Sequence, residues 1–259
     1  MRKFIYVVSL LVVVSFVLVA CGPQNSGQVD KGQSNQSHRE TSRDKDKKAV
    51  VRHTVVIDPG HQEAPMNELE PIGPGASQSK PMLSSGTAGV VTGVTEYQLN
   101  LDVSLKLRDE LEARGYRVVM IREDNHCPIS NKGRAEIANQ YTDGIFLRIH
   151  ANGDSNSSTS GMLTMCTASD NPYTPDIVRD SRRLSQLILV QMLSSTGAAD
   201  KGLIETNNMS GINWCRIPVS IIEMGFMSNP HEDRLMQTQE YQAKIVEGIA
   251  NGVDKYFEI

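Results

Sequence analysis

Apolar residues along the chain fall into short β-branched runs and longer stretches of helical periodicity. A run at 54–57 leads into the turn sequence at 58–60, a pattern typical of a buried strand that ends in a turn. Apolar residues then recur at helical spacing from Leu99 to Leu111, behind the Thr-x-x-Gln pattern of a capping box that begins at Thr95. The pattern therefore predicts a strand, a connection and a long helix.

The same two patterns alternate to the end of the chain. Because crossover helices connect parallel strands, strands that alternate with helices indicate the α/β class. We predict a single domain with a twisted, mostly parallel sheet flanked by helices, and a long loop at 62–94 of the kind that is usually functional. Further strands are expected at 117–121, 144–149, 161–167 and 218–224, and further helices at 131–141, 174–195 and 239–257.

The N-terminal part of the chain has a different pattern. An almost wholly apolar run at 4–19 is shorter than the roughly 20 residues that a membrane span needs, and it is typical of a secretory signal. Residues 22–48 contain no Leu, Ile, Phe, Tyr, Trp or Met, so they cannot bury enough apolar surface to fold. We therefore expect a signal peptide at 1–20, a flexible membrane tether at 21–50 and one folded domain at 51–259.

Charge and composition narrow the possible partners of this domain. The chain carries 26 basic and 30 acidic residues, and only 5% of its residues are aromatic. Without a basic excess or a supply of stacking aromatics, nucleic acid is not an expected partner. Beside Cys21, the cysteines Cys127, Cys166 and Cys215 form no CxxC pair, so a thiolate zinc site is not indicated. At most one disulfide is possible, and small buried side chains are the simpler expectation.

Four polar residues occur where a parallel sheet would present a site. His61 and His150 each follow a predicted strand, and Glu223 interrupts an apolar one. Glu96 lies in the first turn of the first long helix, where a carboxylate also suits the helix dipole. Two imidazoles and a carboxylate are a common zinc-binding set, and a second carboxylate can take a proton from water. A buried Glu223 is costly unless it is paired or bound to a metal, which favours a functional role.

The sequences around these residues resemble the zinc-dependent N-acetylmuramoyl-L-alanine amidases of bacterial cell-wall turnover. The segment VVIDPGH, which ends at His61, looks like the family's opening strand and first zinc ligand. Glu96 with the following LNL looks like the second ligand, and IHAN around His150 is similar to the third. The segment IEMGFMSN looks like the one that carries the family's catalytic glutamate, here Glu223.

The resemblance implies a hydrolase that cleaves the amide bond between N-acetylmuramic acid and L-alanine in peptidoglycan, with 51–259 as the catalytic domain. It implies a Zn²⁺ cofactor held by His61, Glu96 and His150 at the carboxyl ends of the strands. It also implies that Glu223 acts as general base and then as acid toward the leaving amine.

Two departures from the family bear on the substrate. Arg148 stands where the family often has Ser, and strand alternation would place it on the same face as His150. Its guanidinium either binds a substrate carboxylate or pairs with an acid such as Asp143, and both alternatives stay open. We also expect Asn152, in the same motif, to contact substrate. The loop at 62–94 is longer than in many members, which leaves the preferred substrate open.

The segment LVACG resembles a bacterial lipobox. This resemblance implies cleavage before Cys21, a diacylglycerol thioether on its sulfur, and an extracytoplasmic location on the cell membrane. The alternative is an ordinary signal or an uncleaved anchor with an incidental cysteine.

Two other functions stay open. One is a lipoprotein that binds peptidoglycan without cutting it, although such a binder has no need of Glu223. The other is a zinc peptidase that acts on other wall peptides, which composition does not exclude. Peptidoglycan is the expected partner in either case, and the sequence gives no indication of oligomeric state.

Overall fold

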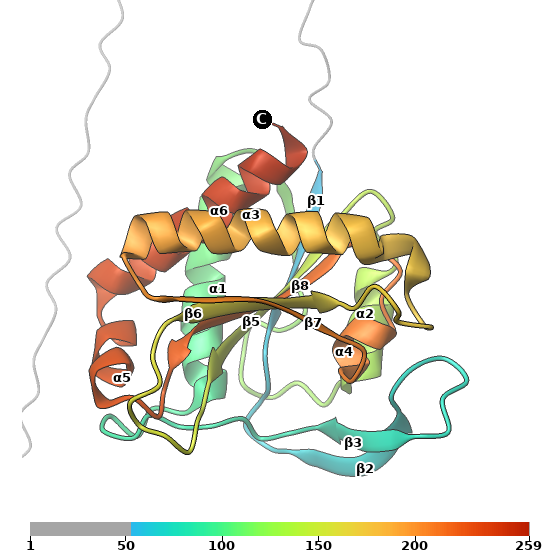
Figure 1. Ribbon diagram of the computed structural model, residues 1–259, viewed down its shortest axis with the longest axis horizontal. Coiled ribbons are helices and arrows are strands. Elements are labelled where there is room, and N and C mark those ends of the chain that lie inside the picture. The colour runs from blue at the N-terminus through green and yellow to red at the C-terminus, as the bar shows by residue number, and fades with distance from the viewer. Residues whose placement is uncertain (1–52, 259) are drawn as a thin grey trace, which may run out of the picture. The chain divides into compact units, whose positions relative to one another are not determined.

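The computed structural model of the chain describes residues 53–258, so Cys21 and the segments expected to be a signal peptide and a tether lie outside the described residues (Figure 1). Its central sheet has six strands in the order β4-β1-β5-β8-β6-β7. These strands are β1 (Thr54–Pro59), β4 (Arg117–Met120), β5 (Ile145–Asn152), β6 (Met162–Thr167), β7 (Asp200–Thr206) and β8 (Val219–Phe226).

Helices pack on both faces of the sheet, as predicted for the α/β class (Figure 1). One face is covered by the long helices α1 (Glu96–Ala113), α3 (Val178–Thr196) and α6 (Gln239–Phe257). The other face is covered by α2 (Asn131–Ala138) and the short α4 (Ser210–Asn213). A further helix, α5 (Pro230–Met236), links β8 to α6.

The continuous apolar runs in the sequence belong to strands that are buried on both faces. In β1, Val55 and Ile57 pack toward α1, whereas Val56 packs toward α2 on the opposite face. Phe146 and Leu147 divide between the same two faces in β5. Because each face has its own helical layer, both side-chain directions are apolar and no polar alternation appears.

The sheet is mostly parallel, as expected, with one antiparallel pair. β1 pairs in parallel with β4 and β5, and β5 pairs in parallel with β8. β6 runs antiparallel to β8, so the chain reverses direction on that side of the sheet. The pattern did not predict β7, which is a partly exposed edge strand with charged residues, or the short helices α4 and α5.

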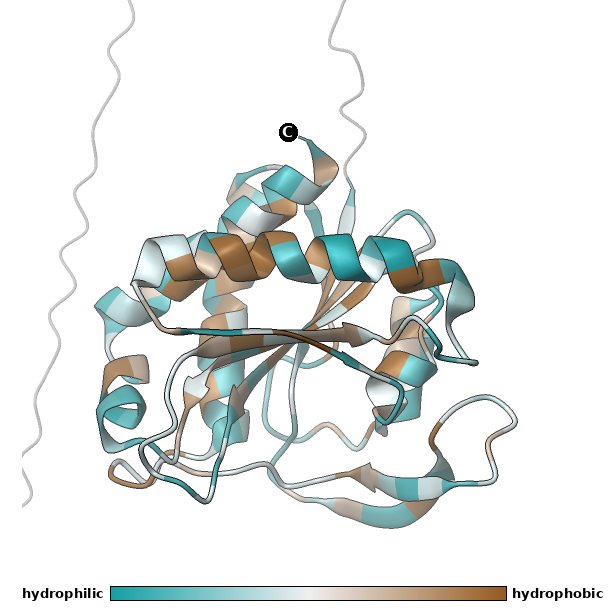
Figure 2. Cartoon of the chain, in the orientation of Figure 1, coloured by the Kyte–Doolittle hydropathy of each residue, from teal (hydrophilic) through white to brown (hydrophobic). Residues whose placement is uncertain are grey.

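The expected long loop at 62–94 is not structureless, which corrects the prediction. It contains an antiparallel hairpin of β2 (Met66–Pro71) and β3 (Ser79–Leu83), which forms a separate two-stranded sheet. Figure 2 shows hydrophilic residues along most of this hairpin. Its strands carry proline and charged residues and bury few side chains, so they lack the apolar alternation that identifies a strand.

Two predicted helix starts also differ in detail. Thr95 is the N-cap residue of α1, but its side chain makes no capping hydrogen bond, so the predicted capping box is wrong. The amide of Glu96 instead donates to the carbonyl of Thr87 at 2.9 Å. The segment from Pro175 to Ile177 forms a 3₁₀ turn, and α3 begins only at Val178.

All three cysteines of the described region, Cys127, Cys166 and Cys215, are buried and free, as small core side chains. Within residues 53–258, no helix combines the length and the apolar character needed to cross a membrane.

Helices α3 and α6 approach each other closely because α6 has glycine at the contact. A Cβ atom on Gly252 would lie 2.6 Å from the Cα of Ile188, and one on Gly248 would lie 2.6 Å from the Cα of Met192. The obstructing atoms are backbone, so they cannot move aside without separating the helices.

We expect Gly252→Ala to lower the free energy of unfolding by about 1–3 kcal/mol, although Ala is the better helix former by about 1 kcal/mol. Urea denaturation of the purified protein measures this, with the exposed Glu247→Ala on the same helix as the control. An unchanged or raised stability of Gly252→Ala would contradict the close packing.

Candidate metal centre and active site

The three predicted metal ligands converge at the carboxyl edge of the sheet. His61 lies two residues after the end of β1, Glu96 is the first residue of α1, and His150 lies in β5. Glu96 Oε1 is 3.1 Å from both His61 Nε2 and His150 Nδ1. The possible ligand atoms of the three residues all lie within 4.8 Å of one another. One atom from each of the three residues can therefore contribute to a single zinc site, in which ligands lie about 2.0–2.2 Å from the ion.

Unpaired buried atoms at the same place support a cation. Among the described residues, His150 Nε2 and Glu223 Oε2 are buried and have no hydrogen-bond partner. Leaving such atoms unpaired costs about 1–3 kcal/mol each. A bound cation with its water would satisfy both, and the donor set of two imidazoles and a carboxylate is one that zinc accepts.

The protonation states of His150 and Glu96 suit a metal. Burial lowers the pKa of His150 to about 4, so its ring is neutral at physiological pH. Burial raises the pKa of Glu96, but hydrogen bonds with His150 and His61 outweigh it and bring the pKa far below the usual range. His61 Nδ1 lies 2.8 Å from the carbonyl of Ser84, and this contact holds the ring with Nε2 toward Glu96.

A tight turn after β1 positions His61. The backbone of His61 has φ of 62°, in the left-handed region that only glycine adopts without strain. The preceding Gly60 lies against His150, because a Cβ on it would be 2.2 Å from His150 Cε1. Glycine at this position therefore lets β1 bring His61 beside the imidazole from the neighbouring strand.

The buried Arg134 holds this turn. Its guanidinium donates to Asp58 Oδ1 at 2.6 Å, to the carbonyl of Pro59 at 3.1 Å and to the carbonyl of His61 at 3.2 Å. Arg122 adds hydrogen bonds to the carbonyls of Pro59 and Gly60 at 2.8 and 3.1 Å. The strained conformation of His61 is thus fixed by hydrogen bonds from two arginines.

Glu223 faces the metal centre from the next strand. It stands opposite His150 in the register of β5 and β8 and is half-buried. Burial and then the nearby charge of Glu96 raise the pKa of Glu223 to about 8. A carboxyl group with a pKa near the working pH can both accept and return a proton, which is what a general base and acid must do.

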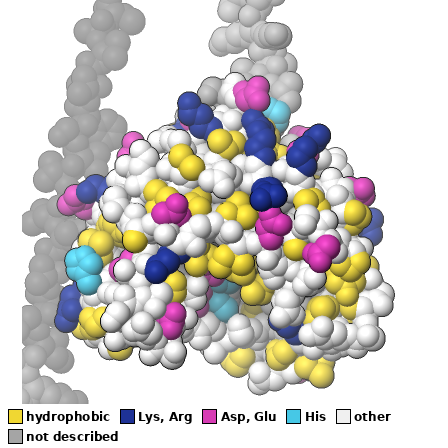
Figure 3. Space-filling view, viewed as in Figure 1, with side chains coloured by type: hydrophobic (Ala, Val, Ile, Leu, Met, Phe, Trp, Pro, Cys, Tyr) yellow, Lys and Arg dark blue, Asp and Glu magenta, His cyan; other side chains and the backbone are white. Residues whose placement is uncertain are grey.

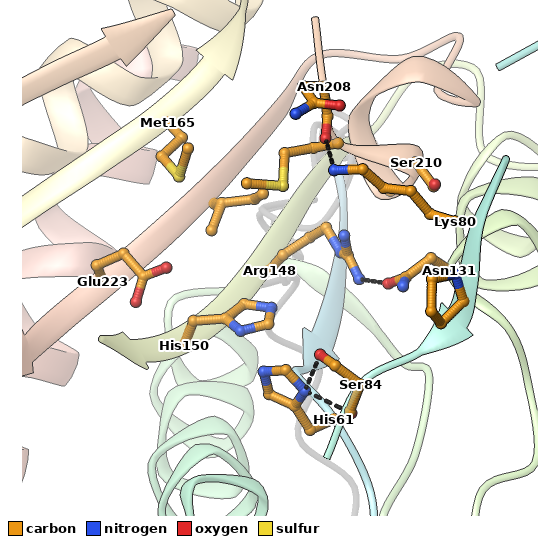
Figure 4. Close-up of a pocket in the computed structure, with 14 residues that line it drawn as sticks. His61, Lys80, Ser84, Asn131, Arg148, His150, Met165, Asn208, Ser210 and Glu223 are labelled. Atoms are coloured by element: carbon orange, nitrogen blue, oxygen red, sulfur yellow. Dashed lines mark hydrogen bonds between the residues drawn. The ribbon is translucent and has the colours of Figure 1, made fainter. Parts of the chain in front are cut away.

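Arg148 pairs with Asp58, not with Asp143. Its Nε donates to Asp58 Oδ2 at 2.9 Å and its Nη2 donates to Asn131 Oδ1 at 2.6 Å. Asp143, offered as a partner on the sequence, lies exposed in the turn before β5. Burial alone would raise the pKa of Asp58, but the charges of Arg134 and Arg148 outweigh burial and bring the pKa down to about 2. Arg148 is therefore structurally paired and also faces the site (Figure 4).

Two cavities meet at His61, His150 and Glu223. The first, of about 330 Å³, extends past Arg148 to the hairpin, and we call it the cationic cavity. The second, of about 600 Å³ and more open, is lined by Asn152 and small polar residues, and we call it the polar groove. Figure 3 shows a histidine side chain in a recess between the hairpin and the rest of the domain.

Several residues of the cationic cavity were not predicted from the sequence. They come from the hairpin, the N-terminus of α2 and the segment before α4, and none carries a recognisable motif. Only the length of the loop at 62–94 indicated that it had a role. These residues include Lys80, Asn131, Asn208 and Ser210.

The hairpin is fastened to the domain by polar contacts at both of its strands. Trp214 Nε1 donates to the carbonyl of Pro71 at 2.9 Å, and Asn131 Nδ2 donates to the carbonyl of Met82 at 2.9 Å. The ammonium of Lys132 lies 4.4 Å from the centre of the Trp214 ring. The single tryptophan therefore supports the hairpin that forms one side of the cavity.

Comparison with known proteins identifies the relatives of this domain. The sequence model of a family described as N-acetylmuramoyl-L-alanine amidase matches residues 55–255. The uncharacterized protein YqiI of Bacillus subtilis is 30% identical over 174 residues, which span 67% of this chain and 79% of YqiI. The N-acetylmuramoyl-L-alanine amidase LytC of the same organism is 26% identical over 211 residues, but these are 82% of this chain and only 37% of LytC.

A solved structure gives the same result. The crystal structure of Ami1, an N-acetylmuramyl-L-alanine amidase from Mycobacterium smegmatis, superimposes with a TM-score of 0.72 at 26% identity. The match covers 80% of this chain and 97% of Ami1.

The raised pKa of Glu223 predicts how pH affects the metal-free protein. Between the ordinary pKa of 4.5 and the folded value of about 8, the folded chain holds a proton on Glu223 that the unfolded chain has lost. The stability contributed by this proton is present below pH 4.5 and is lost as the pH rises toward 8.

Glu223→Gln stays neutral, so its free energy of unfolding should exceed that of the native sequence by a margin that grows to a few kcal/mol across this range. Urea denaturation with a chelator at several pH values measures the margin, and parallel pH profiles of the two proteins would refute the shift.

Proposed function

The chain belongs to the N-acetylmuramoyl-L-alanine amidase family, and we propose that it cleaves peptidoglycan with a zinc ion held by His61, Glu96 and His150. Membership makes it a peptidoglycan amidase, a hydrolase that acts on the cell wall. The observation that carries the zinc proposal is the convergence of these three side chains within 4.8 Å of one another. The unpaired Glu223 beside them supports a catalytic site over a purely structural metal site.

In this mechanism, the residues of the chain divide the work between orientation and proton transfer. When bound, zinc supplies Lewis-acid chemistry that makes water easier to deprotonate and a carbonyl easier to attack. Glu223 accepts a proton from a water molecule while the oxygen of that water attacks the carbonyl carbon of the scissile amide. Glu223 then returns the proton to the amide nitrogen as the carbon–nitrogen bond breaks. The products are a carboxylate on the muramic acid and a free amino group on L-alanine.

The raised pKa of Glu223 supports this role. At neutral pH, the buried carboxyl without a metal is largely protonated, because burial and Glu96 both disfavour its charge. A nearby cation would favour ionisation and bring the group into balance between its two states. Glu96 is not the expected base, because its low pKa makes it a poor proton acceptor and because it is one of the proposed metal ligands.

For the substrate, we propose contacts with Arg148 and Asn152, which line the two cavities that meet at the metal centre. For the location of the protein, we propose a lipid anchor on Cys21 that restricts cutting to peptidoglycan near the membrane. This proposal rests on the LVACG segment alone.

The catalytic proposal predicts a separation of metal binding from turnover. Glu223→Gln should keep about one zinc per chain and lose hydrolysis by a factor of at least about 10², because the proton acceptor is gone while the ligands remain. His150→Ala should lose both, since it removes a ligand. Elemental analysis measures the zinc, and mass spectrometry of digested muropeptides measures cleavage.

Released stem peptides that begin with L-alanine support the amidase, whereas cleavage between amino acids would identify a peptidase. Normal turnover by Glu223→Gln would refute the role of Glu223, and a native protein that binds without cutting would indicate a non-catalytic binder.

The anchor proposal predicts that Cys21→Ala moves the protein from the membrane fraction to the soluble extracytoplasmic fraction, because the thioether cannot form. Fractionation and immunoblotting of cells measure this, with Cys127→Ala as a control that keeps the proposed lipid site. If Cys21→Ala stays with the membrane as completely as the control, the anchor is wrong.

A further inference from the structure

The cationic cavity has an electrostatic character that proton transfer at the metal centre does not require. At one end lie His61, His150 and Glu223, and at the other lie Lys80 and Arg148 (Figure 4). Figure 4 shows Lys80 extending from the hairpin across the cavity and Arg148 reaching into it from β5. The cavity therefore leads from the reacting centre to two positive charges.

Both cations have donors left over. Lys80 Nζ donates to the carbonyl of Asn208 at 2.7 Å, and an ammonium has two further N–H groups. Arg148 uses Nε and Nη2 for Asp58 and Asn131, and its Nη1 makes no hydrogen bond to any described residue. This Nη1 passes beside Gly211, where a Cβ would lie only 1.5 Å from it. The backbone is thus shaped to admit the free end of the guanidinium.

The charges around Arg148 do not balance. Three arginines, Arg122, Arg134 and Arg148, are buried behind the site. Asp58 pairs with Arg134 and Arg148, and Arg122 has no carboxylate partner among the described residues. Burial, and then repulsion from Arg134, lower the pKa of Arg122 to about 10. An excess of buried positive charge attracts an anion into the adjoining cavity.

Neutral groups complete the wall. Ser210 is 6% exposed, and its Oγ is buried without a hydrogen-bond partner among the described residues. Such a hydroxyl can donate a hydrogen bond to a ligand with little further desolvation free energy, because it is already removed from water in the folded protein. The remaining wall includes Met165, Met209 and Ile221, which suit an alkyl chain.

Substrate chemistry then decides which half of the molecule enters. In peptidoglycan the carboxyl of muramic acid is consumed in the scissile amide, so free carboxylates are on the peptide side. The polar groove, by contrast, is lined mainly by Ser, Thr and Gly residues and by Asn152, which suit the hydroxyl groups of sugars.

We propose that the cationic cavity is a carboxylate-binding subsite for the stem peptide, in which Lys80, Arg148 and Ser210 bind a free carboxylate. The subsite rests on the proposed amidase function and adds the direction of the substrate: the peptide lies toward the hairpin and the glycan along the polar groove. Arg148 precedes His150 by two residues on the same strand, about 7 Å away. Two residues of extended peptide span about 7 Å, so the carboxylate belongs to the stem residue after L-alanine.

The test uses two synthetic muropeptides that differ only in a free carboxylate or a primary amide on that residue. The native protein should have the higher kcat/KM with the carboxylate. Lys80→Met should lower the kcat/KM for the carboxylate substrate about tenfold, mainly by raising KM, because a lost charge-assisted hydrogen bond is worth at least about 1.4 kcal/mol. The same variant should lower the kcat/KM for the amide substrate much less. Lys80 lies on the hairpin and outside the hydrophobic core, so the variant should fold.

Lys201→Met, an equal loss of charge on the exposed edge strand β7, is the matched control and should keep the native preference. Equal rates of the native protein with both substrates, or equal losses on both in Lys80→Met, would overturn the subsite. Calorimetric titration with the two free stem peptides measures binding without turnover, so it tests the subsite separately from the amidase function. If the protein releases no peptide with an L-alanine amino terminus, the amidase function is wrong, but the titration still tests the subsite. Tighter binding of the carboxylate peptide, weakened in Lys80→Met alone, is the expected result.

Discussion

The parallel register of β1, β5 and β8 determines how His150, Glu223, Arg148 and Asp58 lie relative to one another. Asp58 is paired with Arg148 across the first two strands, and His150 is paired with Glu223 across the next two. Because side chains alternate between the faces of a strand, a slip of one residue in β5 would turn His150 away and bring Ile149 into the site. The two apolar layers that sandwich the sheet prevent that slip, since each strand must bury both of its faces.

The buried carboxylate of Asp58 connects this register to the metal centre. It pairs with Arg134, which also holds the carbonyl of His61, and with Arg148, which faces the cationic cavity. Removing one partner of a buried ion pair leaves an uncompensated charge and typically costs about 3–5 kcal/mol. One acid therefore supports both the strained turn that presents a metal ligand and the guanidinium proposed to bind substrate.

Catalysis and selectivity come from different parts of the fold. The proposed metal ligands and Glu223 lie on the central strands, next to them or at the start of α1, where packing holds them firmly. The β2–β3 hairpin is a separate sheet, fastened through Trp214 and Asn131, and it contributes Lys80 to the cavity wall. Changes in such an appended element can alter which substrate is accepted without disturbing the chemistry, because few core contacts depend on it.

The sequence by itself determined the α/β class and the mostly parallel sheet, and it indicated four candidate site residues, because apolar periodicity and short motifs are local properties of the chain. His61, Glu96, His150 and Glu223 could be identified on motifs alone. The hairpin, with its charged and proline residues, gave no such pattern.

Only the tertiary structure decided what Arg148 pairs with, because Asp58 is 90 residues away in the chain while Asp143 is a close neighbour. It also decided that Lys80 and Ser210 share one cavity, since contacts between distant segments depend on how the strands and loops are packed together.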